Sequence, residues 1–213
     1  RLSSRISNAY ALDAHSRGHS VVAAPNVVSI GQWINDCWQQ LIVSADTIAL
    51  SLFPLSTDQE HALWESIVAD SVLGSALLRP KATAQQAMTA YKQLVDWQQN
   101  LNDRSLRENF GFDEDASTLL AWTDEFNRIC EKNRWLPGAK MGEVVLQAFR
   151  DKRLKAEETI IGLGFEDLPP LNHSLLREAG HFSKFEQPSN PGEVAVVACE
   201  SLEQELHAAA VWA

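Results

Sequence analysis

Apolar residues recur at helical spacing along most of the chain, and the clearest case begins at residue 29. Ser29 and Gln32 have the spacing of a capping box, in which two side chains close the first turn of a helix. The following residues place apolar side chains on one helix face and amides on the opposite face. The apolar stripe consists of Ile30, Trp33, Ile34, Cys37, Trp38, Leu41 and Ile42. We therefore expect an amphipathic helix that starts at residue 30 and packs against a core.

Residues 56–135 repeat the helical spacing and contain no convincing strand pattern. Thr57 with Glu60, and Thr83 with Gln86, predict capping boxes for the first two helices of this stretch. The next helix carries on its apolar face Leu119, Trp122, Phe126, Ile129 and Cys130. We expect this stretch to form a helical subdomain.

Two features of the helical stretch stand apart from its apolar stripes. Residues 104–116 combine Gly111 with a run of acids and predict a mobile loop. Most of the seven tryptophans fall on apolar stripes, which is typical of core residues. Trp97 is the exception, because Gln98 and Gln99 follow it directly, and it is the best candidate for stacking on a nucleic-acid base.

Short β-branched runs predict strands on both sides of the helical stretch. Thr159–Leu163 is the strongest, and its length and composition favour a strand buried on both faces. The runs Val21–Ala24, Phe182–Phe185 and Val194–Cys199 predict three more strands, and residues 169–179 predict a helix. Because strands that alternate with helices form parallel sheets, we expect an α/β fold with a three-layer parallel sheet and an α-helical insertion.

This pattern divides the chain into three segments. Residues 1–55 form the first part of the α/β domain, residues 56–135 form the α-helical insertion subdomain, and residues 136–213 form the second part of the α/β domain. The chain begins at Arg1 and ends at Ala213 inside helical patterns. We expect it to be a piece of a longer protein.

Charge and cysteine content narrow the classes of function. The net charge is −10, with 18 basic and 28 acidic residues, which argues against broad binding to the phosphate backbone of DNA. Cys37, Cys130 and Cys199 lack the spacing of a metal site or a disulfide framework, so we expect reduced core cysteines, no metal, and a cytoplasmic location. No apolar run is long enough for a membrane span, and no signal-peptide pattern is present.

Short motifs occur in a distinctive order along the chain. They are Arg1-Leu2-Ser3, Pro25–Ile34 (PNVVSIGQWI), Glu60–Glu65 (EHALWE), Trp135-Leu136, Gly164–Pro169 (GFEDLP) and Glu205–Ala213 (ELHAAAVWA). In this order they resemble a group of bacterial DNA repair proteins described as inactivated superfamily I helicases, of the UvrD/RecB kind and related to AddB. The resemblance implies a sheet of the P-loop NTPase type, similar to helicase domain 1A, with an insertion similar to domain 1B.

The resemblance also places the metal-binding motif of active helicases, DEFQD, on Leu163, Gly164, Phe165, Glu166 and Asp167. Leu163 stands where an aspartate would hold Mg²⁺, and Gly164 stands where a glutamate would polarise the attacking water. Phosphoryl transfer depends on such aimed charges, and the loss of one typically costs about 3 kcal/mol. No G-x-x-x-x-G-K-[S/T] loop is present in the chain. We therefore expect a degenerate motif with no catalytic residues, no cofactor and no ATP hydrolysis.

The same resemblance indicates candidate contacts with single-stranded DNA. Pro25, Asn26 and Ser29 fall where the helicase family contacts the strand, although an ordinary strand-to-helix turn accounts for them equally well. Arg1 and Arg5 follow another DNA-contacting motif and are candidates for phosphate contacts, with solvated arginines as the simpler interpretation.

Three functional hypotheses follow. The first is a non-catalytic helicase-like domain of a DNA repair or recombination protein, which serves as a scaffold and guides single-stranded DNA. Its implied partners are a nuclease domain of the PD-(D/E)xK type or a working helicase subunit. The second is a protein docking module that uses the helical insertion and makes no DNA contact. The third is an active ATPase with its P-loop upstream of Arg1, against which Leu163 and Gly164 argue.

Overall fold

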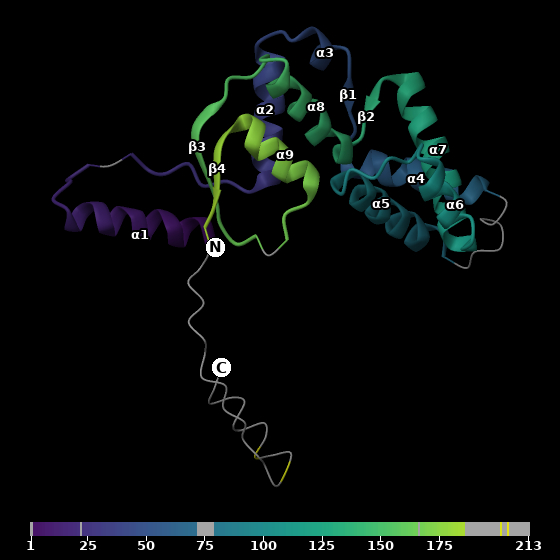
Figure 1. The fold of residues 1–213 in the computed structure, drawn as a ribbon, viewed down its shortest axis with the longest axis horizontal. Helices are drawn as coiled ribbons and strands as arrows, with labels where there is room; N and C mark the ends of the chain where they lie inside the picture. The colour runs from purple at the N-terminus through teal and green to yellow at the C-terminus, as the bar shows by residue number, and fades with distance from the viewer. Residues whose placement is uncertain are drawn as a thin grey trace.

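The computed structural model describes residues 2–21, 23–71, 79–165, 167–185, 201 and 204, and most of them are helical (Figure 1). The helices are α1 (Leu2–Ser16), α2 (Ile30–Val43), α3 (Thr47–Leu50), α4 (Thr57–Asp70), α5 (Pro80–Asp96), α6 (Arg104–Phe110), α7 (Glu114–Asn133), α8 (Gly138–Arg150) and α9 (Pro170–Ala179). The strands are β1 (Phe53–Pro54), β2 (Trp135–Leu136), β3 (Glu157–Gly162) and β4 (Gly180–Lys184).

The expected three-layer parallel sheet of the P-loop NTPase type is wrong. Within the described residues the strands form two separate two-stranded parallel sheets, β1 with β2 and β3 with β4. Around the predicted strand Val21–Ala24, the described residues have no strand partner, and the prediction at Val194–Cys199 lies outside the described residues. A β-branched run favours extended backbone locally, but a sheet also needs a partner strand, and that depends on distant parts of the chain.

Helices α2, α8 and α9 pack beside the β3–β4 sheet (Figure 1). Gly142 on α8 lies where these helices meet, because a methyl group at this position would be in ordinary van der Waals contact with Leu171 on α9, at 3.4 Å, and with Ile34 on α2, at 3.7 Å. Ile160 on β3 packs against this core, whereas Ile161 is 61% exposed on the opposite face. The prediction of a strand buried on both faces is therefore wrong for β3, since helices of the described part of the chain cover only one of its faces.

Helices α4, α5 and α7 pack around three aromatic rings. Trp64 stacks on Phe126 with ring centres 4.4 Å apart, and the Tyr91 ring meets Phe126 edge-on at 5.2 Å. The Tyr91 hydroxyl donates a hydrogen bond of 2.8 Å to Oδ1 of Asn127, so this polar group is satisfied where its ring is buried. The predicted helical character of this stretch is confirmed by the described residues.

The starts of two of these helices differ from the predictions. The capping box of α4 uses Ser56 and Gln59, one residue before the predicted pair Thr57 and Glu60. Both pairs satisfy the same local pattern, and the carboxylate of Glu60 instead accepts a hydrogen bond from the Gly138 amide. Helix α5 begins at Pro80 rather than near Thr83, which is consistent with the preference for proline in the first helical turn.

The predicted mobile loop at 104–116 is also wrong, because it contains α6 and the first turn of α7. Asp103 accepts a hydrogen bond of 3.0 Å from the Leu106 amide and caps α6. Asp113 accepts one of 2.8 Å from the Ala116 amide and caps α7. Of the acids that indicated a loop, Asp113 thus serves as a helix N-cap, and Glu114 and Asp115 lie in the first turn of α7.

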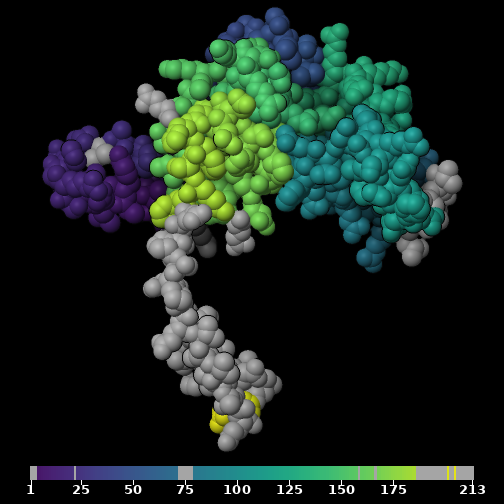
Figure 2. Space-filling view, in the orientation of Figure 1, coloured from purple at the N-terminus to yellow at the C-terminus, as the bar shows by residue number. Residues whose placement is uncertain are grey.

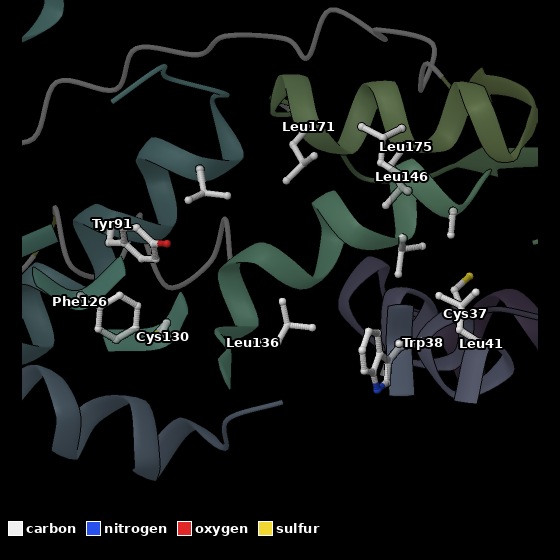
Figure 3. Close-up of a cluster of buried hydrophobic side chains, with 14 of the residues drawn as sticks. Cys37, Trp38, Leu41, Tyr91, Phe126, Cys130, Leu136, Leu146, Leu171 and Leu175 are labelled. Atoms are coloured by element: carbon white, nitrogen blue, oxygen red, sulfur yellow. The ribbon is translucent and has the colours of Figure 1, made fainter. Parts of the chain in front are cut away.

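One hydrophobic cluster joins the helices α4, α5 and α7 to the helices α2, α8 and α9 beside the β3–β4 sheet. Figure 3 shows it passing from Tyr91 and Phe126 through Leu136 and Leu146 to Cys37. Backbone hydrogen bonds at β1 and β2 reinforce the connection, including one of 2.9 Å that the amide of Leu55, the residue after β1, donates to the Leu136 carbonyl. The division into segments 1–55, 56–135 and 136–213 remains a prediction, although the core itself is continuous.

Helix α1 lies at one side of the molecule (Figures 1 and 2). Most of its described side chains are exposed, including Tyr10 and Leu12, while Ala14 is buried. None of the helices among the described residues is long and apolar enough to cross a membrane.

Candidate functional site

The segment after β3, which the resemblance assigns to a degenerate motif, combines apolar side chains with an exposed acid. Leu163 and Phe165 are half-buried, Gly164 adopts a left-handed φ of +74°, and Asp167 is exposed. A methyl group at Gly162 would lie 2.8 Å from the Phe182 ring and 3.1 Å from the Phe165 ring, so both rings lie against the strand end. Glu166 lies outside the described residues. The strand end is therefore packed by aromatic rings at Gly162.

The candidate DNA-binding residues lie on two different elements. Pro25, Asn26 and Ser29 follow one another along the segment that leads into α2, with Pro25 half-buried and the other two exposed. Ser29 caps α2 by accepting a hydrogen bond of 3.2 Å from the Gln32 amide, which accounts for its place in the sequence pattern. Arg5 is exposed on α1, and Arg1 lies outside the described residues. The structure therefore gives Ser29 a structural role and leaves DNA contact as a prediction.

A cleft of about 730 Å³ opens in the helical part of the chain. It is bounded by the end of α5, the following loop, α6 and the start of α7. Its wall includes Gln93, Leu94, Trp97, Asn100, Leu106 and Phe110. Trp97 is 50% exposed, whereas Trp38 and Trp64 are buried in the core. The prediction that Trp97 lies outside the core is therefore confirmed, as is the prediction that Trp38 and Trp64 lie within it.

The backbone holds Trp97 at the end of α5. Gln98 takes a left-handed φ of +51°, and the Gln99 amide donates a 2.9 Å hydrogen bond to the Leu94 carbonyl. This is the geometry of a Schellman motif, which ends the helix immediately after Trp97. Arg107 on α6 fixes the far side of the loop by donating a 2.6 Å hydrogen bond to the Leu101 carbonyl. These backbone contacts therefore fix the position of the Trp97 indole at the edge of the cleft.

The basic residues near the cleft are paired with acids of the same chain. Arg104 contacts Glu108 at 2.7 Å, and Lys92 contacts Asp96. Arg107 makes two hydrogen bonds to Asp124, of 3.0 and 2.7 Å, and this carboxylate raises the pKa of the Arg107 guanidinium. Because each cation is balanced internally, these side chains present little positive charge to a ligand.

The buried titratable groups outside the cleft have structural surroundings. Burial raises the pKa of the Cys37 thiol to about 11 and that of the Cys130 thiol to about 12. A thiol of this kind stays protonated and unreactive at neutral pH. Both cysteines are free and buried, which confirms their prediction as reduced core residues, while Cys199 lies outside the described residues.

Sequence patterns identified Trp97 but missed Asn109 and Phe110, which line the same cleft from α6. The sequence signal that identified Trp97 was its place at the end of an amphipathic helical pattern, with the amide side chains of Gln98 and Gln99 directly after it. Asn109 and Phe110 fell in the stretch interpreted as a loop, so their position on a helix face was hidden.

In the part of the chain that the structure describes, no cluster of three His, Cys, Asp or Glu residues has a metal-holding arrangement. Comparison with known proteins finds no matching family model, no matching curated protein and no matching solved structure.

Proposed function

We propose that this chain is a non-catalytic docking module of a bacterial DNA repair or recombination protein, with α5, α6 and α7 as its binding surface. The observation that carries the docking function is the half-exposed Trp97 at the edge of the 730 Å³ cleft. Tryptophan is enriched among the residues that dominate binding energy in protein interfaces. The DNA repair context is supported by the ordered motifs of the sequence, and the free thiols of Cys37 and Cys130 support a cytoplasmic location.

The non-catalytic character is supported by the residues after β3. Leu163 and Gly164 replace the two acids that an ATP-hydrolysing motor would use. The Phe165 and Phe182 rings pack against Gly162 at the strand end. An apolar surface of this kind gives no charge stabilisation to a magnesium–nucleotide complex.

Protein docking is favoured over guidance of single-stranded DNA. Binding to a DNA backbone needs unpaired Lys and Arg side chains, whereas Arg104 and Arg107 beside the cleft are both held in ion pairs. The net charge of −10 adds a repulsive average field for nucleic acid. A DNA strand is therefore the less favoured occupant.

The docking function is tested by selecting short random peptides displayed on phage against the whole chain. Peptides retained by the wild type should be lost on the Trp97→Ala variant and kept on Phe112→Ala, since Phe112 is 89% exposed and is not part of the cleft wall. Circular dichroism would check that both variants are folded. Selection that yields no Trp97-dependent peptide would contradict docking at this cleft.

The DNA alternative has a separate test. Fluorescence anisotropy with a labelled oligothymidine strand, at low and moderate salt, should show no salt-sensitive binding. Binding that weakens steeply with salt would indicate phosphate contacts and would favour the strand-guiding function instead.

A further inference from the structure

The wall of the cleft is mainly apolar below its rim. The Trp97 ring lines it together with four apolar side chains, which are Leu94 on α5, Leu106 and Phe110 on α6, and Leu119 on α7. Each of these four side chains is only partly buried. The volume of about 730 Å³ lies within the usual range for binding pockets, about 300–1,000 Å³. A surface of this composition gains free energy when a large apolar side chain displaces water from it.

The rim carries carboxamides suited to a peptide backbone. Gln93 and Asn109 line the cleft, and among the described residues their side-chain amides make no hydrogen bond. A carboxamide offers both a donor and an acceptor, which matches the N–H and C=O groups of an extended peptide. The neighbouring Asn100 uses its Oδ1 to accept a 3.1 Å hydrogen bond from the Asn102 amide and holds its loop in shape.

The charge around the cleft is negative. Residues 90–119 contain three bases, which are Lys92, Arg104 and Arg107, and each is in an ion pair. The same residues contain six acids, which are Asp96, Asp103, Glu108, Asp113, Glu114 and Asp115. Within the described structure Asp103 and the run 113–115 form no ion pair, and Asp103 itself lines the cleft. Charges of one sign beside an apolar cleft attract ligands of the opposite sign and repel polyanions.

Resting on the docking function proposed above, we infer that the cleft binds a peptide segment of a partner protein in which a large apolar side chain is flanked by Lys or Arg. The apolar side chain lies against Trp97, Leu106 and Phe110. The side-chain amides of Gln93 and Asn109 form hydrogen bonds with the peptide backbone. The basic flanks face Asp103 and the acids at the start of α7.

The composition of the selected peptides is the first test. Sequences that depend on Trp97 should be enriched in Leu, Ile, Phe or Trp next to Lys or Arg. A synthetic peptide of the enriched sequence, labelled for fluorescence anisotropy, should bind more weakly as salt rises. Replacing its bases by Gln, or its apolar residue by Ala, should weaken binding at least about tenfold.

Matched variants of the chain test the charge separately from the fold. Asp103→Asn keeps an N-cap oxygen for α6 while removing the charge, because Asn caps helices as well as Asp does. Combined with Glu114→Gln and Asp115→Asn, it should weaken binding several-fold and reduce the salt dependence. Trp97→Ala should weaken binding at least about tenfold, and Phe112→Ala should leave it unchanged.

The outcomes separate this inference from the docking function. Trp97-dependent peptides without a basic bias, or an affinity indifferent to the three acid substitutions, would overturn the charge preference and leave docking intact. Failure to select any Trp97-dependent peptide would overturn both. Displacement of the bound peptide by oligothymidine would identify the cleft as a nucleic-acid site and would likewise overturn both.

Discussion

Glu60 joins two helices through a buried carboxylate. It lies on α4, is only 7% exposed, and accepts a hydrogen bond from the Gly138 amide in the first turn of α8. Gly138 suits this position, because a methyl group there would lie 3.1 Å from Oε1 of Glu60. Helix N-termini favour negative charge, so the carboxylate also complements the dipole of α8. The buried hydrogen-bonded position of Glu60 thus gives the first residue of the Glu60–Glu65 motif a structural role.

Replacement of Glu60 should reveal the cost of burying its charge. Burial raises the pKa of this carboxyl, and the hydrogen bond from Gly138 offsets part of that effect. For an acid with a raised folded pKa, the stabilising contribution is fully present below the unfolded pKa and is lost as pH rises through the folded pKa. Glu60→Gln keeps an acceptor oxygen and removes the charge, so the free energy of unfolding should lose this pH dependence and be at least as high at neutral pH.

Urea unfolding at a series of pH values measures the effect. Glu60→Ala serves as the contrast, because it removes the charged acceptor of the part-buried hydrogen bond from the Gly138 amide and should lower the free energy of unfolding by about 1–3 kcal/mol. A Glu60→Gln variant that retains the wild-type pH dependence would show that another group titrates in this range.

At the scale of single elements, several helices end with a residue in the left-handed region. Ala45, Gln98 and Lys152 each follow a helix with a positive φ, between 51° and 59°. The amide of the next residue closes the turn in each case, as when the Arg153 amide donates to the Ala148 carbonyl at 2.8 Å. These ends were hard to predict, because the sequence has no glycine at any of the three positions.

Lys152→Gly should stabilise the protein. Lys152 is exposed with φ at +59°, a conformation that costs a residue with a Cβ about 1–2 kcal/mol and costs glycine little. After the greater chain entropy of unfolded glycine is subtracted, we expect a gain of about 0.5–1 kcal/mol. Thermal unfolding followed by circular dichroism measures this gain. Gln147→Gly, at an exposed position inside α8, should instead destabilise by about 1 kcal/mol.

At the scale of the whole molecule, α8 connects the helical part with the β3–β4 part. It packs against α2, α5 and α9, and Val145 and Leu146 on α8 belong to the cluster that continues to Tyr91 on α5 and Leu175 on α9 (Figure 3). Elements that share one core lose their packing together. We therefore expect cooperative unfolding of both parts despite the long helical stretch between the two strand regions.

Phe126→Ala tests this cooperativity. Phe126 is fully buried between Trp64 and Tyr91, so its removal should lower the free energy of unfolding by about 3–5 kcal/mol. Loss of helix, seen by far-ultraviolet circular dichroism, and loss of tryptophan burial, seen by fluorescence, should keep the same midpoint. Phe112→Ala, at an exposed position, should change stability by less than about 0.5 kcal/mol. Two separated transitions would show that the parts fold independently.

Local sequence patterns by themselves determined the apolar faces of α2 and α7, the helical structure of α9, the burial of Cys37 and Cys130, and the unusual position of Trp97. These properties depend on neighbours within a few turns, which periodicity captures. Tertiary structure alone decided which strands found partners, where the carboxylate of Glu60 came to lie, and that α5, α6 and α7 enclose a cleft. Each of these depends on contacts between residues far apart in the chain, and local propensity carries no information about them.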